Sequence, residues 1–170
     1  WNWYAKHFGM DLPFFNDAAE ATLMSDYTGG EPQKRKAVLA MNLQGGGGFE
    51  VWQFTSRTPT ASKSPIKEGD LGINSVQMRC LDVHKSKAYF DQLPNTSCSE
   101  VKRNDLNKSY FEVIDPFSNS FKIIEDNYQF MRTNSLVGGV MGATIGVSNI
   151  EKSLKLYTEA LNYKVIQQKQ

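Results

Sequence analysis

The sequence predicts an α+β fold built from repeated βαβββ modules, in which antiparallel strands carry helices on one face. The prediction depends on internal similarities that recur at a spacing of about 70 residues. Three pairs of segments resemble each other, namely 4–12 with 157–165, 75–86 with 142–153, and 48–54 with 120–125. Each pair matches one kind of element: a helix end, a strand that enters a helix, or a strand that follows a turn.

The repeats divide the chain into three modules, of which only the middle one is complete. Residues 1–55 hold a helix tail and the last three strands of a first module, and residues 70–130 form a whole second module. Residues 139–170 supply the strand, helix and strand that start a third module. Polar or glycine-containing linkers at 56–69 and 133–139 separate them. Because the chain has no initiator Met, we expect it to be a piece of a longer or processed protein.

In the first module, a helix tail over 1–8 is expected to end at Gly9, since glycine readily adopts the left-handed conformation that ends helices. Asn162 occupies the same place in the later copy. Strands over 36–43 and 48–54 flank a run of four glycines, which predicts a hairpin.

In the second module, an alternating run that begins at Ser75 predicts a strand, which turns at Asp82 into a helix. Pro116, together with acidic and amide residues on either side, predicts a turn over 115–119. The segment 120–125 after this turn has the composition of a strand.

The third module is expected to begin with a strand that leads into a capped helix. Ser148 and Glu151 have the spacing of a capping box. One apolar helical face follows, made by Ile150, Leu154, Tyr157 and Leu161.

Composition limits the classes of function. The 170 residues are 40% hydrophobic and carry a formal net charge of +1, which lacks the basic excess of a nucleic-acid-binding surface. The sequence has no apolar run of about 18 residues, so we expect no membrane span. No export signal is visible, and Cys80 and Cys98 make no disulfide framework, which favours a cytoplasmic protein with free thiols.

Three of these segments resemble motifs of the vicinal oxygen chelate superfamily, which includes glyoxalase I, bleomycin-resistance proteins and extradiol dioxygenases. Asp115–Phe121 is similar to the superfamily's Asp-Pro-x-Gly-Asn turn, with Ser118 in place of Gly. Residues 143–157 are similar to its opening strand and helix, and Gly47–Trp52 to its Gly-Gly-x-Glu-Leu strand. The resemblance implies that the sheets of two modules pair into a cup, with helices on the outer face.

In such proteins a divalent metal usually lies on the floor of the cup, held by His or Gln from first strands and Glu from last strands. At the matching positions of this chain only Glu50 is a ligand type, because the others are Ser75, Lys122 and Gly142. The resemblance therefore implies an incomplete ligand set and no certain cofactor. A divalent metal would be expected only in a longer protein that supplies the missing strands.

Alternation of side chains along each strand predicts which residues face the cup. They are Glu50, Trp52, Ser75, Gln77, Arg79 and Lys122. We expect Glu50 to pair with Lys122, since a buried cation needs an anion, and this leaves Arg79 for an anionic ligand group. The alternative at this point is that Arg79 and Lys122 lie at a flared edge of the sheet and are solvated.

Other residues with potential chemistry are expected away from the cup. His7 and His84 are interpreted as solvated helix residues rather than ligands. Core positions are expected for four aromatic residues, Tyr110, Phe111, Phe121 and Phe130.

Together these observations predict a glyoxalase, bleomycin-resistance or dioxygenase-like protein that binds a small anionic or aromatic molecule in the cup. The expected binding residues are Arg79, Lys122, Gln77, Ser75 and Trp52. The alternative is a fragment or non-catalytic half of a metal-dependent lyase or extradiol-type dioxygenase, with Glu50 as a metal ligand. The sequence leaves enzymatic activity open. A homodimer through the unfinished modules is a third expectation, because incomplete sheets expose strand edges.

Overall fold

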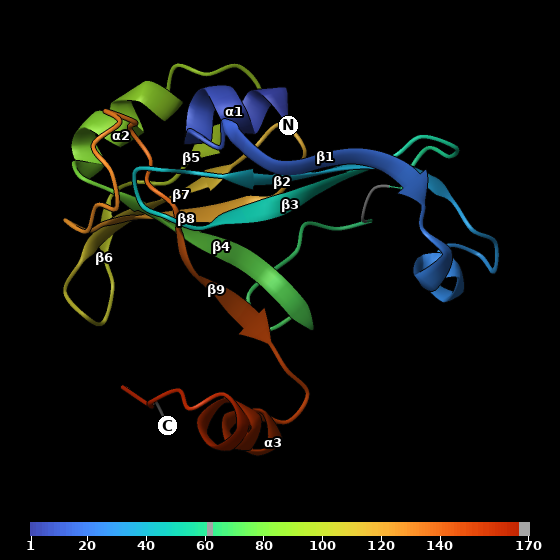
Figure 1. Ribbon diagram of the computed structural model, residues 1–170. Helices are drawn as coiled ribbons and strands as arrows, with labels where there is room; N and C mark the ends of the chain where they lie inside the picture. The colour runs from blue at the N-terminus through green and yellow to red at the C-terminus, as the bar shows by residue number, and fades with distance from the viewer. Residues whose placement is uncertain (61–62, 167–170) are drawn as a thin grey trace.

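The computed structural model describes residues 1–60 and 63–166, whose strands form two sheets (Figure 1). The smaller sheet is antiparallel and has the order β1-β2-β3, with β1 over Leu12–Glu20, β2 over Lys34–Met41 and β3 over Gly48–Phe54. A short 3-10 helix, η1 (Thr22–Tyr27), lies between β1 and β2. The predicted hairpin at the glycine run is confirmed as the turn between β2 and β3.

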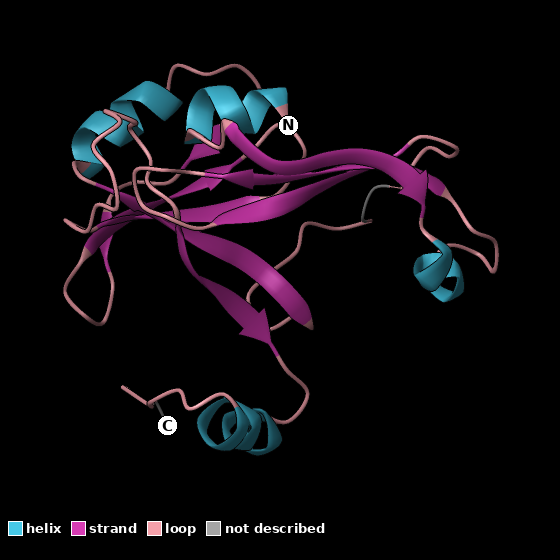
Figure 2. Ribbon diagram, viewed as in Figure 1, coloured by secondary structure: helices cyan, strands magenta, loops and turns pink. Residues whose placement is uncertain are grey.

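The larger sheet contains the strands that follow the linker. Its order is β5-β7-β8-β4-β9, and β6 also pairs with β7. The bounds of these strands are Gly72–Cys80 for β4, Ser97–Cys98 for β5, Lys102–Arg103 for β6, Ser109–Ile114 for β7, Ser120–Glu125 for β8 and Val140–Gly146 for β9. Strands β4 and β8 run parallel, and the other pairs are antiparallel. The predicted α+β class is confirmed, and the described strands do not close into a barrel (Figure 2).

Two helices lie on the same side of the sheets (Figure 2), and local chemistry sets where each begins or ends. Helix α1 (Asn2–Phe8) ends at Gly9, whose φ of 63° is the left-handed conformation predicted there. A side chain at this position would also collide with the Asn42 amide, 2.8 Å from an added Cβ atom. Helix α2 (Val83–Phe90) begins after Asp82, whose carboxylate accepts a hydrogen bond from the Lys85 amide.

The last helix lies apart from both sheets (Figure 1). Helix α3 (Ile150–Lys155) continues into a π-helical turn, η2 (Leu156–Ala160), and neither contains a buried residue. The capping box predicted at Ser148 is wrong, because the Asn149 side chain accepts the hydrogen bond from the Lys152 amide instead. The final strand predicted for this module does not form over 162–166, and the rest of that prediction lies outside the described residues. Among the helices of the described residues, none is long and apolar enough to cross a bilayer.

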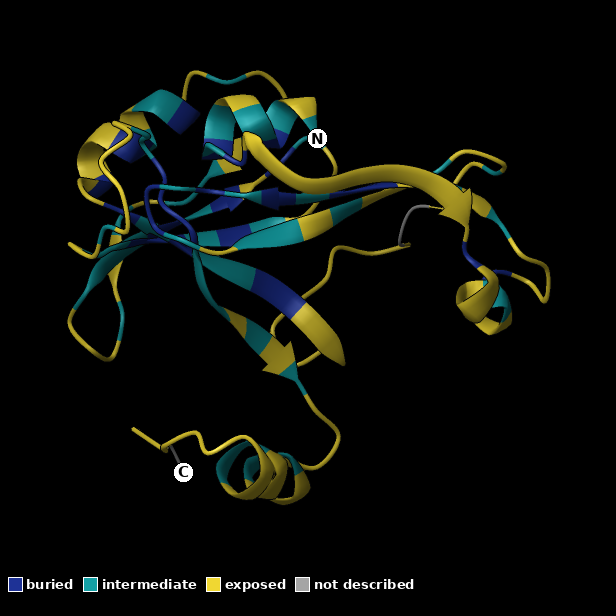
Figure 3. Ribbon diagram, in the orientation of Figure 1, coloured by how far each residue is buried: buried dark blue, intermediate teal, exposed yellow. Residues whose placement is uncertain are grey.

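The core lies between the sheets and helices α1 and α2, where Figure 3 shows the buried residues gathered. Strand alternation correctly predicts these strand residues of the core. Met78 and Cys80 of β4 are buried, and so are Phe121 and Ile123 of β8. The core position predicted for Phe130 is wrong, because its side chain is 62% exposed.

A return segment, residues 130–139, joins the two sheets by docking on the turn between β2 and β3. The Phe130 amide donates to the Gln44 carbonyl at 2.7 Å, and the Asn42 side-chain amide donates to the Val137 carbonyl at 2.9 Å. These bonds hold the chain where it enters β9, which then pairs with the free edge of β4. The end of the return segment is also bonded to β4, because the Gly138 amide donates to the Arg79 carbonyl at 2.6 Å and the Arg79 amide donates to the Gly139 carbonyl at 3.2 Å.

We expect the variant Ser118→Gly to raise the free energy of unfolding by about 1 kcal/mol. Ser118 has a φ of 69° in the turn before β8, a conformation that costs energy for any residue with a Cβ atom. Glycine removes this strain without a contact being lost. Urea denaturation measures the change, and Ser118→Ala is the control that should be no more stable than the natural protein. Equal stability of the glycine variant would contradict the strain.

Candidate functional site

A cavity of about 470 Å³ lies on the face of the larger sheet that points away from the core. We call it the sheet cavity. Three basic, three acidic and four neutral side chains line it. Its lining residues are Lys102, Arg103, Lys122, Glu68, Asp105, Glu112, Gln77, Asn104, Tyr110 and Ile124.

Strand register places the central residues of this cavity side by side. Lys122 of β8 lies opposite Glu112 of β7 and also opposite Gln77 of β4. Residues paired in this way point to the same face of a sheet and are about 5 Å apart. Gln77 and Lys122 therefore share the cavity, as the alternation of their strands predicts.

Most of the charges in the sheet cavity are neutralised by a partner. Lys102 and Glu112 form an ion pair with 3.7 Å between Nζ and Oε2, and Lys122 pairs with Glu68 of the linker. The hydrogen bond from Lys122 also lowers the pKa of the Glu68 carboxyl.

Arg103 differs from the two lysines because it has no carboxylate partner among the described residues. Its Nη1 donates to the backbone carbonyl and the side-chain oxygen of Asn107, at 2.9 and 3.1 Å. A guanidinium carries five N–H donors, so this contact leaves donors available for an anion.

The predicted pair between Glu50 and Lys122 is wrong, because Lys122 binds Glu68 instead. Glu50 is exposed on β3, in the smaller sheet, and makes no ion pair within the described part of the chain. The physical reason is the path of the linker, which carries Glu68 over β8.

Arg79, predicted to be free for a ligand, is occupied by protein groups. Its Nε lies 3.4 Å from a carboxylate oxygen of Asp126. Its guanidinium carbon lies over the Tyr128 ring, 4.9 Å from the ring centroid. Its Nη1 also donates to the Val140 carbonyl at 3.3 Å. These contacts place the Arg79 side chain beside the return segment, outside the lining of the sheet cavity.

The two remaining predicted residues also lie outside that lining. Ser75 is buried, and its hydroxyl has no hydrogen-bond partner among the described residues. Trp52 lies on β3 with its ring 5.0 Å from the Arg35 guanidinium and 6.2 Å from the Phe54 ring. Of the predicted set, Gln77 and Lys122 line the sheet cavity, whereas Ser75, Arg79 and Trp52 do not.

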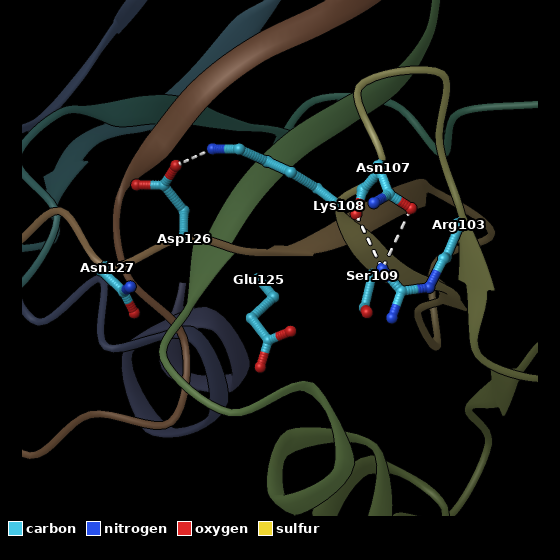
Figure 4. A pocket seen from close by; sticks show the side chains of 7 residues that line it. All are labelled: Arg103, Asn107, Lys108, Ser109, Glu125, Asp126 and Asn127. Carbon is cyan, nitrogen blue, oxygen red and sulfur yellow. Dashed lines mark hydrogen bonds and ion pairs between the residues drawn. The ribbon is translucent and has the colours of Figure 1, made fainter.

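A smaller cavity of about 350 Å³ adjoins the turn between β6 and β7 (Figure 4). Figure 4 shows the Lys108 side chain reaching toward Asp126, with which it pairs, and Arg103 meeting Asn107 on the other side. Arg103 lines both cavities. Because Lys108 is already paired, Arg103 is the basic group here that has no carboxylate partner among the described residues.

The residues present do not fit a divalent metal of the kind that the superfamily resemblance implies. Among the described residues, no group of three His, Cys, Asp or Glu side chains could hold one. Lys122 lies at the expected position of a carboxylate ligand, and its ammonium group would repel a cation.

The histidines and cysteines lie outside the sheet cavity. His84 is exposed on α2, as predicted, whereas His7 is partly buried and its Nδ1 lies 2.8 Å from the Tyr89 hydroxyl. Burial lowers the pKa of His7 and raises the pKa of the Cys80 thiol to about 12, so this cysteine is an unreactive core residue.

Comparison with known proteins supports the fold alone. No protein-family model matches the sequence, and a search of curated proteins finds no match either. Among solved structures, the chain is similar to a glyoxalase family protein from Bacillus cereus, with a TM-score of 0.54 and 13% identity. The alignment covers 66% of this chain and 76% of that protein. The expected glyoxalase-like architecture is thus confirmed at the level of the fold.

Proposed function

We propose that this chain binds a small molecule with an anionic group in the sheet cavity. The observation that carries the proposal is Arg103, a lining cation without a carboxylate partner among the described residues. A guanidinium binds a carboxylate through two parallel hydrogen bonds, which fixes the orientation of the ligand as well as its charge. Arg103 thus takes the role that the sequence suggested for Arg79.

Other lining residues suit the rest of such a ligand. Lys122 and Gln77 present a cation and an amide on neighbouring strands. Tyr110 and Ile124 lie side by side in the lining, but Ile124 is buried, so polar groups make up most of the surface that a ligand would meet. A volume of about 470 Å³ suits a molecule the size of an ordinary metabolite.

A glyoxalase-like fold agrees with this role, since the larger sheet carries the sheet cavity on the face that points away from the core. The alternative, a half of a metal-dependent lyase or extradiol-type dioxygenase, requires ligands from residues outside the described part of this chain. No contact of Glu50 among the described residues favours it.

Titration with benzoate tests the proposal, because benzoate combines a carboxylate with a ring. We expect Arg103→Gln to weaken benzoate binding about tenfold to one-hundredfold, since a hydrogen bond to a charged group is worth about 1.5–3 kcal/mol. Isothermal titration calorimetry measures the affinities.

Two controls accompany this titration. Arg132→Gln removes an exposed arginine that makes no ion pair in the described structure, and should leave the affinity unchanged. Benzamide, which has the same ring without the charge, should bind more weakly than benzoate. Equal binding of the two compounds, or no effect of Arg103→Gln, would refute the anion site.

A further inference from the structure

Lys122, the central cation of the sheet cavity, is held by a residue that belongs to no strand or helix. Glu68 lies in the linker segment 63–71 and contributes the carboxylate of the pair. The Lys122 side chain is only 18% exposed, whereas that of Glu68 is 68% exposed. The carboxylate therefore reaches a cation of the sheet from the solvent side, which is also the side from which a ligand would come.

The local structure of the linker explains how Glu68 is presented. The Lys67 amide donates to the Asp70 carboxylate at 2.8 Å, and the Asp70 amide donates to the Lys67 carbonyl at 3.1 Å. These bonds close a turn with Glu68 near its tip. Asn74 at the start of β4 fixes the turn by donating to the Asp70 carbonyl at 2.9 Å.

Within the sheet, the carboxylate that could take the place of Glu68 as the partner of Lys122 already has a partner of its own. Glu112 lies opposite Lys122 in the register, but its carboxylate pairs with Lys102. Release of Glu68 would therefore leave the cavity with an excess of one positive charge, because three basic residues would face two acidic ones, Asp105 and Glu112. An anionic ligand would restore the balance.

We infer that Glu68 is a tethered competitor for the ligand, so that a ligand whose anionic group binds Arg103 enters the sheet cavity by displacing the Glu68 carboxylate from Lys122. This inference rests on the proposed function, which supplies the anion. Since the carboxylate is largely exposed, its pair with Lys122 is weak enough to open reversibly. If the linker closes the site in most molecules, only the open fraction can bind the ligand. The apparent affinity is then the intrinsic affinity multiplied by that fraction.

The test measures benzoate affinity and linker protection in the natural chain and in Glu68→Gln. We expect the variant to bind benzoate about threefold to tenfold more tightly, because the competing carboxylate is gone. Glu31→Gln is the matched control, since it removes the same charge from an exposed residue before β2 that makes no ion pair in the described structure. It should leave the affinity unchanged.

Hydrogen–deuterium exchange supplies a readout that does not depend on the affinity. Uptake by the peptide that covers 63–71 should rise in Glu68→Gln, and should also rise when benzoate is added to the natural chain. Equal affinities of the natural chain and Glu68→Gln, or a linker whose exchange benzoate leaves unchanged, would overturn the competition while the binding function stands. Absence of benzoate binding in both proteins would overturn the proposed function and the competition with it.

Discussion

Replacement of Phe8 by Ala is expected to lower the free energy of unfolding by about 3–5 kcal/mol. The Phe8 side chain is fully buried, with its ring centroid 4.7 Å from that of Phe121 and 5.5 Å from that of Phe90. The truncation removes this apolar surface and leaves a cavity that rigid neighbours fill only in part. Urea denaturation followed by circular dichroism measures the loss.

The effect matters because Phe8 joins two parts of the chain. It lies on α1, which precedes the smaller sheet, whereas Phe90 and Phe121 belong to α2 and β8. One shared core predicts that Phe8→Ala lowers the stability of the whole described chain in a single transition. Two separate transitions, of which only one shifts, would show instead that the parts fold independently.

Phe14→Ala is the matched control for this experiment. Phe14 lies on β1 with 79% of its side chain exposed, so its removal empties no packed space. We expect a change within about 0.5 kcal/mol. A loss as large as that of Phe8→Ala would mean that β1 is covered in solution.

The ends of helices could be predicted from the sequence where residues adjacent along the chain determine them. The end of α1 at Gly9 and the start of α2 after Asp82 follow from the conformations and hydrogen bonds that these residue types favour. The error at Ser148 has the same origin, because Ser148 and Asn149 are both good capping residues. Only the backbone conformation decides that Asn149 accepts the bond.

Burial could be predicted for many residues of the regular strands, although Ser75, which was expected to face the cup, is buried next to a register shift in β4. Met78 and Ile123 lie in regular strands, and both are buried on the expected face. Phe130 lies in the return segment, which has no regular period. Its backbone is anchored to Gln44, while its ring points outward.

The site was predictable in part for the same reason. Gln77 and Lys122 lie on long strands, so alternation places them on the cavity face. Arg103 belongs to β6, a two-residue strand too short to show a period. One available signal was the asparagine-rich turn between Lys102–Arg103 and Ser109–Tyr110, which is typical of a hairpin.

The long-range ion pairs had no signal in the sequence. Glu68 is 54 residues from Lys122 along the chain, and Asp126 is 47 residues from Arg79. Nothing in the local composition of a linker indicates which charge it will meet. Tertiary structure alone therefore decides that Lys122 is paired by the linker and that Arg79 is withdrawn from the cavity.

Asp115 should be the second position with a large effect on stability. We expect Asp115→Ala to lower the free energy of unfolding by about 3–4 kcal/mol, because the buried Tyr4 hydroxyl and two amides of the turn would lose their acceptor. The Asp115 carboxylate accepts hydrogen bonds from the amides of Phe117 and Asn119, at 2.9 and 2.8 Å, and also from the Tyr4 hydroxyl. Burial, and then the hydrogen bond to Asp115, raise the pKa of Tyr4, so its hydroxyl stays protonated and donates.

Two further variants separate the contributions of this carboxylate. Tyr4→Phe removes two hydrogen bonds, the one donated to Asp115 and the one accepted from the Asn119 side chain, and leaves those within the turn, so it should cost about 1–2 kcal/mol. Asp115→Asn keeps one acceptor oxygen in the same shape and should fall between Tyr4→Phe and Asp115→Ala. Because Tyr4 is on α1 and Asp115 precedes β8, the double variant Tyr4→Phe/Asp115→Ala should cost less than the sum of the two single losses. Strict additivity in urea denaturation would contradict a direct link between the helix and the turn.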